Sequence, residues 1–157
     1  MVWKYEPTRS SVHIYNDPNL LNSSLVYKNK LIVNLEKLVV EDVPRFRGQT
    51  IKPYVPKRHL VALDVQTGKE LWRIEKNTLS KIPHLSFPHP PVAHAGKLYA
   101  VGIREAGEEI TQILFCINPH DGKMEWQLLL CRGLNETNMF GRTVRETTIT
   151  PPAIADG

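Results

Sequence analysis

The sequence predicts an all-β protein built from repeated four-stranded units. The apolar segments are short, rich in β-branched and aromatic residues, and bounded by turn residues, which is typical of strands. Helical periodicity is almost absent along the 157 residues. The segment HLVALDVQTGKELWRI (59–74) has an ungapped counterpart, ILFCINPHDGKMEWQL (113–128). Such an internal repeat takes priority over other features when a fold is assigned.

The second half of each repeat reads as two strands joined by a short turn. In the first copy we expect strands over 59–65 and 69–74. In the second copy we expect them over 112–118 and 123–130. The spacing between turn and strands is the same in both copies, so both predict the same hairpin.

Eight residues at matching positions define this hairpin. Asp64 and Asn118 are expected to accept backbone N–H groups across the turn, as Asx side chains do. Gly68 and Gly122 stand where the turn needs a positive φ, as in a type I turn followed by a G1 bulge. The complete set is Asp64, Thr67, Gly68, Trp72, Asn118, Asp121, Gly122 and Trp126.

The first half of each repeat predicts a further hairpin. SSLVYKNKLIV (23–33) aligns with PPVAHAGKLYA (90–100), and PPAIADG (151–157) matches the start of the latter. VWKY (2–5) reads as the end of a last strand, with Trp3 in the place of Trp72. The predicted divisions are a last strand of a preceding unit at 1–5, a unit at 23–76 with an insertion at 37–58, a unit at 90–130, and a first strand of a following unit at 151–157.

Four-stranded antiparallel units in series indicate a β-propeller. The chain would supply two complete blades and one strand of each neighbouring blade. Because a propeller needs about four to eight blades to close its ring, we expect the chain to be a fragment of a larger protein. The remaining blades of the same propeller are then its first expected partners.

Residues 62–72, ALDVQTGKELW, resemble the pyrroloquinoline-quinone (PQQ) repeat, A-x-D-x-x-T-G-x-x-x-W. The second copy keeps Gly122 and Trp126 but replaces the other three consensus residues. The resemblance covers about half of the chain. It implies tryptophans that pack between neighbouring blades, and a bacterial protein that is periplasmic or extracellular. The family includes quinoprotein dehydrogenases and also propellers that bind no quinone.

Three functions are compatible with this resemblance. The first is a non-catalytic scaffold or binding module for a protein, peptide or glycan. The alternative is part of a PQQ-dependent dehydrogenase, which would use calcium, a catalytic Asp and adjacent cysteines. The chain lacks Cys-Cys and an acidic cluster, so PQQ and calcium are expected only if the missing blades supply the site. A hydrolase site is the third, without a G-x-S-x-G motif to support it.

No catalytic, cofactor-binding or metal-binding residue is predicted. His84, His89 and His94, at spacings of five, are interpreted as chance occurrences and not as a metal site.

Long connections are predicted at 6–22, 37–58, 76–89 and 131–150, and the strand order places them on one face of the ring. Long loops on a rigid scaffold often carry function. The candidate ligand-face residues there are Arg45, Arg47, Asn138, Arg142 and Arg145. Two alternatives remain open: the 37–58 insertion as a solvated loop, and the later arginines as bridges between blades.

Charge, hydropathy and cysteine content bear on which functional classes of protein remain possible. The net charge of +4 is scattered along the chain, which argues against nucleic-acid binding. No apolar run approaches the ~20 residues of a membrane span, and MVWKYEPTRS lacks the apolar region of a signal peptide. Cys116 and Cys131 are expected to be two buried free thiols, with a disulfide as the alternative.

Overall fold

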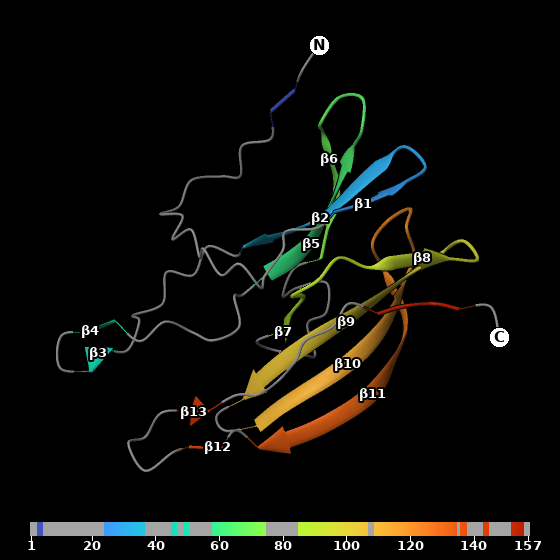
Figure 1. Ribbon diagram of the computed structural model, residues 1–157. Coiled ribbons are helices and arrows are strands. Elements are labelled where there is room, and N and C mark those ends of the chain that lie inside the picture. The colour runs from blue at the N-terminus through green and yellow to red at the C-terminus, as the bar shows by residue number, and fades with distance from the viewer. Residues whose placement is uncertain are drawn as a thin grey trace.

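Every regular element that the structure describes is a β-strand. This computed structural model describes residues 3–4, 24–36, 45–46, 49–50, 58–74, 85–106, 109–134, 136–137, 143–144 and 152–155. Two antiparallel sheets, one of four strands and one of five, contain most of these residues (Figure 1). The all-β prediction is confirmed. Both sheets are open, so the propeller itself stays a prediction.

The first sheet, called sheet 1, is a simple antiparallel meander in the order β1-β2-β5-β6. Its strands are β1 (Ser24–Tyr27), β2 (Lys30–Glu36), β5 (Arg58–Asp64) and β6 (Glu70–Arg73). β2 and β5 pair along their whole length. This is the strand order expected for one repeat unit.

The second sheet, called sheet 2, is also an antiparallel meander, and its last three strands are longer than those of sheet 1. Its strands are β7 (Leu85–Ser86), β8 (Val92–His94), β9 (Lys97–Ala106), β10 (Glu109–Ile117) and β11 (Met124–Leu134). β7 and β8 pair with opposite ends of β9, so together they take the place of a single first strand. Three prolines lie between them within 87–91. Proline has no N–H to donate to a strand ladder, which explains the interruption.

Two short strand pairs lie outside the main sheets. β3 (Arg45–Phe46) pairs with β4 (Gln49–Thr50), and β12 (Glu136–Thr137) pairs with β13 (Thr143–Val144). Figure 1 shows both pairs on the side of the molecule opposite to the β5–β6 and β8–β9 turns. Most of the 37–58 and 131–150 connections lies outside the described residues, so their emergence on one face of a ring stays a prediction.

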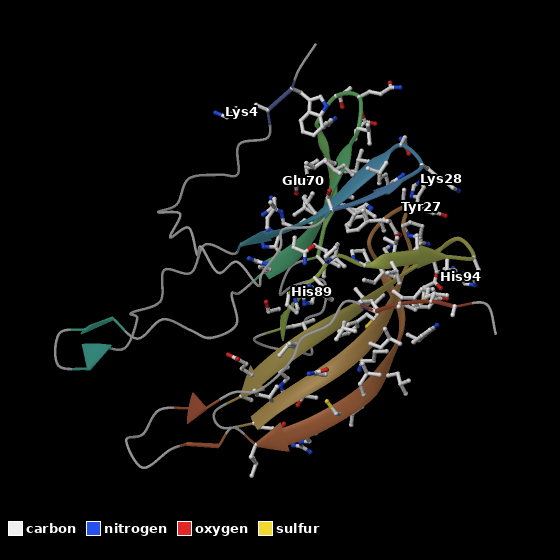
Figure 2. All side chains as sticks on the ribbon, in the orientation of Figure 1. Lys4, Tyr27, Lys28, Glu70, His89 and His94 are labelled. Carbon is white, nitrogen blue, oxygen red and sulfur yellow. The ribbon has the colours of Figure 1, made fainter. Side chains whose placement is uncertain are left out.

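The hydrophobic core lies between the two sheets. Alternate side chains of β5 and β10 point into it, as the two-residue period of a strand requires. Phe87 and Phe115 pack edge to face, with ring centroids 5.6 Å apart. Tyr27 points from β1 toward sheet 2 (Figure 2) and packs against the same cluster. The buried members are Ile32, Leu60, Ala62, Trp72, Ile74, Leu85, Phe87, Leu98, Ala100, Ile113, Phe115 and Ile117.

The predicted end of the second unit at residue 130 is wrong. β9 and β10 are connected by only residues 107–108, so their ladder extends to Ala106 and Glu109, and β11 continues alongside to Leu134. Cys131 therefore lies within β11 and is exposed. The expectation of two buried thiols is confirmed for Cys116 and wrong for Cys131, although both thiols are free.

The two flanking strands predicted at 1–5 and 151–157 are not formed in the described part of either segment. Residues 3–4 and 152–155 belong to no strand. A strand is defined by a hydrogen-bonded neighbour, and each of these segments would need one from another unit. None of the described elements is a helix able to cross a membrane.

Candidate functional site: the tryptophan docking contacts

The β5–β6 turn is organised around Asp64. Its backbone closes the turn, because the N–H of Gly68 donates to the Asp64 carbonyl (2.8 Å) and the N–H of Asp64 donates to the Lys69 carbonyl (2.8 Å). Its carboxylate Oδ1 accepts from the N–H groups of Gln66 (3.0 Å) and Thr67 (2.8 Å), and from the Thr67 hydroxyl (2.9 Å). The predicted role of Asp64 is confirmed.

The β10–β11 turn repeats this geometry around Asn118. The N–H of Gly122 donates to the Asn118 carbonyl (2.9 Å), and the N–H of Asn118 donates to the Lys123 carbonyl (2.8 Å). The Asn118 side chain accepts from the N–H of His120 (2.9 Å). Asp121, at the position of Thr67, accepts from the N–H of Lys123 (3.1 Å).

Both turn glycines adopt the left-handed conformation. Their φ angles are 70° at Gly68 and 71° at Gly122, as predicted. A register irregularity precedes each turn, between Ala62 and Leu63 in β5 and between Cys116 and Ile117 in β10. The two turns are therefore the same local structure.

Trp3 packs against the first of these turns. Its indole N–H donates to the Val65 carbonyl (2.8 Å). A Cβ atom added to Gly68 would collide with the indole ring. The glycine is thus needed both for its φ and for the close approach of the ring.

Trp72 packs against the second turn in the same way. Its indole N–H donates to the Pro119 carbonyl (3.0 Å). A Cβ on Gly122 would lie only 2.7 Å from Trp72 Cε3. Trp72 comes from the outer strand of sheet 1, so this contact joins the two sheets. We call each such pair of a tryptophan and a turn a docking contact.

Trp126 is the third tryptophan of the series, and its surroundings differ. It pairs across the ladder with Cys116, as Trp72 pairs with Ala62. Trp126 is 45% exposed, compared with 8% for Trp72. Among the described residues its ring contacts Tyr99, with centroids 5.9 Å apart. Trp126 therefore has the position of a docking tryptophan, but no turn within the described ranges receives it.

The turn carboxylates are stabilised in their charged form. Hydrogen bonds from the Thr67 backbone and hydroxyl lower the pKa of Asp64 below its ordinary value. The backbone N–H and side chain of Lys123 lower the pKa of Asp121. Near Trp126, the ion pair with Glu125 raises the pKa of Lys97.

Sequence reasoning missed the acceptors of the docking contacts. Val65 and Pro119 each follow the Asx residue of their turn directly. A backbone carbonyl carries no signature in side-chain identity. The only available signal was position, since the residue after the Asx points its carbonyl out of the turn in both copies.

A polar junction between the sheets was also missed. Arg58, 2% exposed, donates from Nη1 to the Pro88 carbonyl (3.3 Å), and its backbone N–H donates to Ser86 Oγ (2.8 Å). Asn34 Nδ2 donates to the Phe87 carbonyl (2.8 Å). These side chains replace strand pairing along the proline-rich stretch, where the backbone of sheet 2 would otherwise lack partners.

The candidate ligand-face residues are not brought together by the described structure. Arg45 is placed only through its backbone, which pairs with Thr50 in the β3–β4 pair. The other four, Arg47, Asn138, Arg142 and Arg145, lie outside the described residues.

Metal-ligating side chains are dispersed in the described part of the chain. None of their His, Cys, Asp and Glu side chains form a group of three that could hold a metal ion. Cys116 and Cys131 lie in different strands, one buried and one exposed. Figure 2 shows His89 near β7 and His94 at the β8–β9 turn, well apart from each other.

Comparison of the chain with protein-family models and with curated proteins gives no match. The resemblance to the PQQ repeat therefore stays a prediction.

Proposed function

We propose that the chain is a segment of a PQQ-like β-propeller and acts as a non-catalytic scaffold or protein-binding module. The observation that carries this proposal is the repetition of the docking contact. Trp3 packs on the Gly68 turn, and Trp72 packs on the Gly122 turn. In both contacts the indole N–H donates to the backbone carbonyl of the residue that follows the Asx residue of the turn. A contact that recurs from one unit to the next is typical of repeat architectures, in which each unit buries its face against its neighbour.

Sheet order supports the same proposal. Sheets 1 and 2 are both meanders in chain order, and they pack face to face through the core described above. A propeller is built from such four-stranded meanders arranged around an axis. Sheets 1 and 2 are then consecutive blades, with Trp72 as the contact between them.

The binding surface that we propose is the side of the molecule that carries the β3–β4 and β12–β13 pairs (Figure 1). Connections on this side are long, whereas the β5–β6 and β10–β11 turns on the other side are short and fixed by hydrogen bonds. A rigid scaffold that presents long loops is suited to binding a protein, peptide or glycan.

The test of the propeller is the coding sequence on either side of the 157 codons. Further copies of A-x-D-x-x-T-G-x-x-x-W, reaching at least about four units in total, are the expected result. Flanking sequence without such copies would contradict the proposal.

The test of the non-catalytic role is a titration of the full-length protein encoded by that reading frame with PQQ and calcium, followed by quinone absorbance. We expect no saturable binding, and stoichiometric binding would favour the dehydrogenase alternative.

A further inference from the structure

The free edge of sheet 2 is formed by β11, which pairs with β10 on one side only (Figure 1). β11 is 11 residues long, and every one of its residues is exposed. On its other side, alternate residues direct backbone N–H and C=O groups away from β10, as in any edge strand. No strand among the described elements pairs with these groups. The edge of β11 is therefore open to a further strand.

The corresponding edge of sheet 1 is protected, whereas that of sheet 2 is not. β6 has four residues, and Glu70 and Arg73 form an ion pair on it (2.6 Å). Short strands and charges are the usual protection of an edge, and propellers leave only short, protected edges. Residues 126–131 of β11, WQLLLC, contain neither a charge nor a proline. When the ungapped alignment of the two copies is continued, Leu129 takes the position of Glu75, so the repeat itself does not require a leucine there.

Leu129 lies on the face of β11 that a following blade would not cover. It pairs across the ladder with Ile113, which belongs to the core between the two sheets. Directly opposite residues of neighbouring strands point to the same face, so Leu129 points to the side of sheet 1. It is nevertheless 57% exposed. In the proposed propeller the following blade packs on the other face of sheet 2, called the outer face, and leaves Leu129 exposed.

Two bulges determine what kind of strand fits this edge. The β10–β11 register shifts twice, which leaves Glu125 and Leu130 as extra residues of β11. Bulges bend a strand and disrupt its ladder, so they divide β11 into the regular stretches 126–129 and 131–134. The β11 of a second copy would carry the same two bulges, and the two edges could not pair along their length. A short, extended peptide needs only one regular stretch.

We propose that the edge of β11 binds an extended apolar peptide of a partner protein, which adds a strand to sheet 2 over residues 126–129. The occupant follows by continuity, because the added strand extends the existing β9–β10–β11 ladder. In this mode of recognition, backbone hydrogen bonds give affinity and alternate side chains give specificity. Successive peptide side chains would lie beside Leu128 on the outer face and beside Leu129 on the other face, which favours apolar residues at both positions.

This inference rests on the proposed function, because a closed propeller covers the faces of its blades and leaves β11 at the rim. The site is separate from the surface proposed for the side that carries the β3–β4 and β12–β13 pairs. It names the partner class for the rim: a segment without stable structure of its own that becomes a strand on binding.

The test uses the full-length protein encoded by the reading frame that contains this chain. The probe is a fluorescein-labelled peptide of about seven residues, alternating valine and threonine, and its binding is followed by fluorescence anisotropy. We expect saturable binding to the wild-type protein. Leu129→Lys places a charge beside the added strand and should weaken binding by at least about tenfold. A peptide that is N-methylated at each backbone amide keeps its side chains but lacks ladder donors, and it should not bind.

The matched control is Leu71→Lys, which makes the same substitution at an exposed leucine of β6, the corresponding edge of sheet 1. This variant should bind the peptide as the wild-type protein does. Circular dichroism confirms that both variants are folded, and sedimentation velocity gives their mass in solution.

Four results would overturn the inference. Absence of saturable binding to the wild-type protein shows that the edge does not accept a strand. Equal weakening by Leu129→Lys and Leu71→Lys shows adhesion without a site on β11, and binding of the N-methylated peptide shows a contact without a ladder. Self-association that Leu129→Lys abolishes shows that a second copy is the occupant. Each result leaves the Trp72 contact and the search for flanking repeats, on which the proposed function depends, unaffected.

Discussion

The indole N–H of Trp72 donates to the carbonyl of Pro119 at 3.0 Å, across 47 residues of sequence. This single bond connects the outer strand of sheet 1 to the turn of sheet 2. The ring beneath it packs on Gly122, where no side chain could fit. The contact therefore fixes the position of one sheet relative to the next.

Replacing Trp72 should separate packing from hydrogen bonding. Trp72→Phe keeps an aromatic ring but leaves the Pro119 carbonyl without its donor, and we expect a loss of about 1 kcal/mol in unfolding free energy. Trp72→Ala should cost about 3–5 kcal/mol. Trp126→Phe is the control, since this indole is exposed, and should change stability by less than about 0.5 kcal/mol. Urea denaturation measures all three. Equal effects at Trp72 and Trp126 would contradict the docking role of Trp72.

The turn glycines provide a matched pair for the steric contact. Gly96 and Gly122 have φ angles of 79° and 71°, but only Gly122 has a neighbour within van der Waals range of an added Cβ. Gly96→Ala should cost about 1–2 kcal/mol from the left-handed backbone alone. Gly122→Ala should cost about 1–3 kcal/mol more, because the Cβ overlaps Trp72. Urea denaturation tests this difference, provided that the two variants unfold with equal m-values. Equal losses of unfolding free energy in Gly96→Ala and Gly122→Ala would refute it.

Asp64 should make the stability of the chain depend on acid pH. Its pKa in the folded chain lies below the ordinary 3.8, chiefly because of the Thr67 backbone hydrogen bond. The stabilisation is therefore present above pH 3.8 and is lost as the pH falls through the folded pKa. We expect the stability advantage of wild type over Asp64→Asn to shrink across this range in pH-dependent urea denaturation. Asn118→Asp should increase the unfolding free energy relative to wild type, but only at pH values at which the new carboxyl is ionised. A constant difference between wild type and Asp64→Asn would argue against the carboxylate as the turn acceptor.

The two thiols should react at very different rates. Cys131 is exposed in β11, whereas Cys116 is 1% exposed and its pKa is raised by burial. Since the thiolate is the reactive form, a disulfide reagent at neutral pH should modify Cys131 first. Cys131→Ser should remove the fast phase, and Cys116→Ser should leave it intact. A single fast phase for both thiols would place Cys116 at the surface.

The turn chemistry was predictable from sequence because it is local. Asx acceptors and positive-φ glycines act within about five residues, so their pattern determines their structure wherever they occur. Asp64 and Gly68 in one copy, and Asn118 and Gly122 in the other, behave as their spacing indicated. The four-strand order follows from the same hairpins and from the repeat.

The lengths of the strands in sheet 2 were not predictable in this way. β11 continues to Leu134 because β9 and β10 extend beside it, not because its own sequence changes at residue 130. Cys131 is exposed because β11 is the edge strand of sheet 2, and every residue of β11 is exposed. The polar junction at Arg58 likewise exists only because a proline-rich stretch of the other sheet passes next to it.

By itself, the sequence determined an all-β repeat with two equivalent hairpin turns and a tryptophan after each, because these features depend on residues close in the chain. Only the tertiary structure decided what each tryptophan contacts. Trp72 and Pro119 approach each other because the two sheets share an apolar core. Trp126 remains exposed because no described turn lies on the outer face of sheet 2. The same residue type in the same local pattern is buried or exposed according to whether another unit packs against it, and local sequence carries no information on that neighbour.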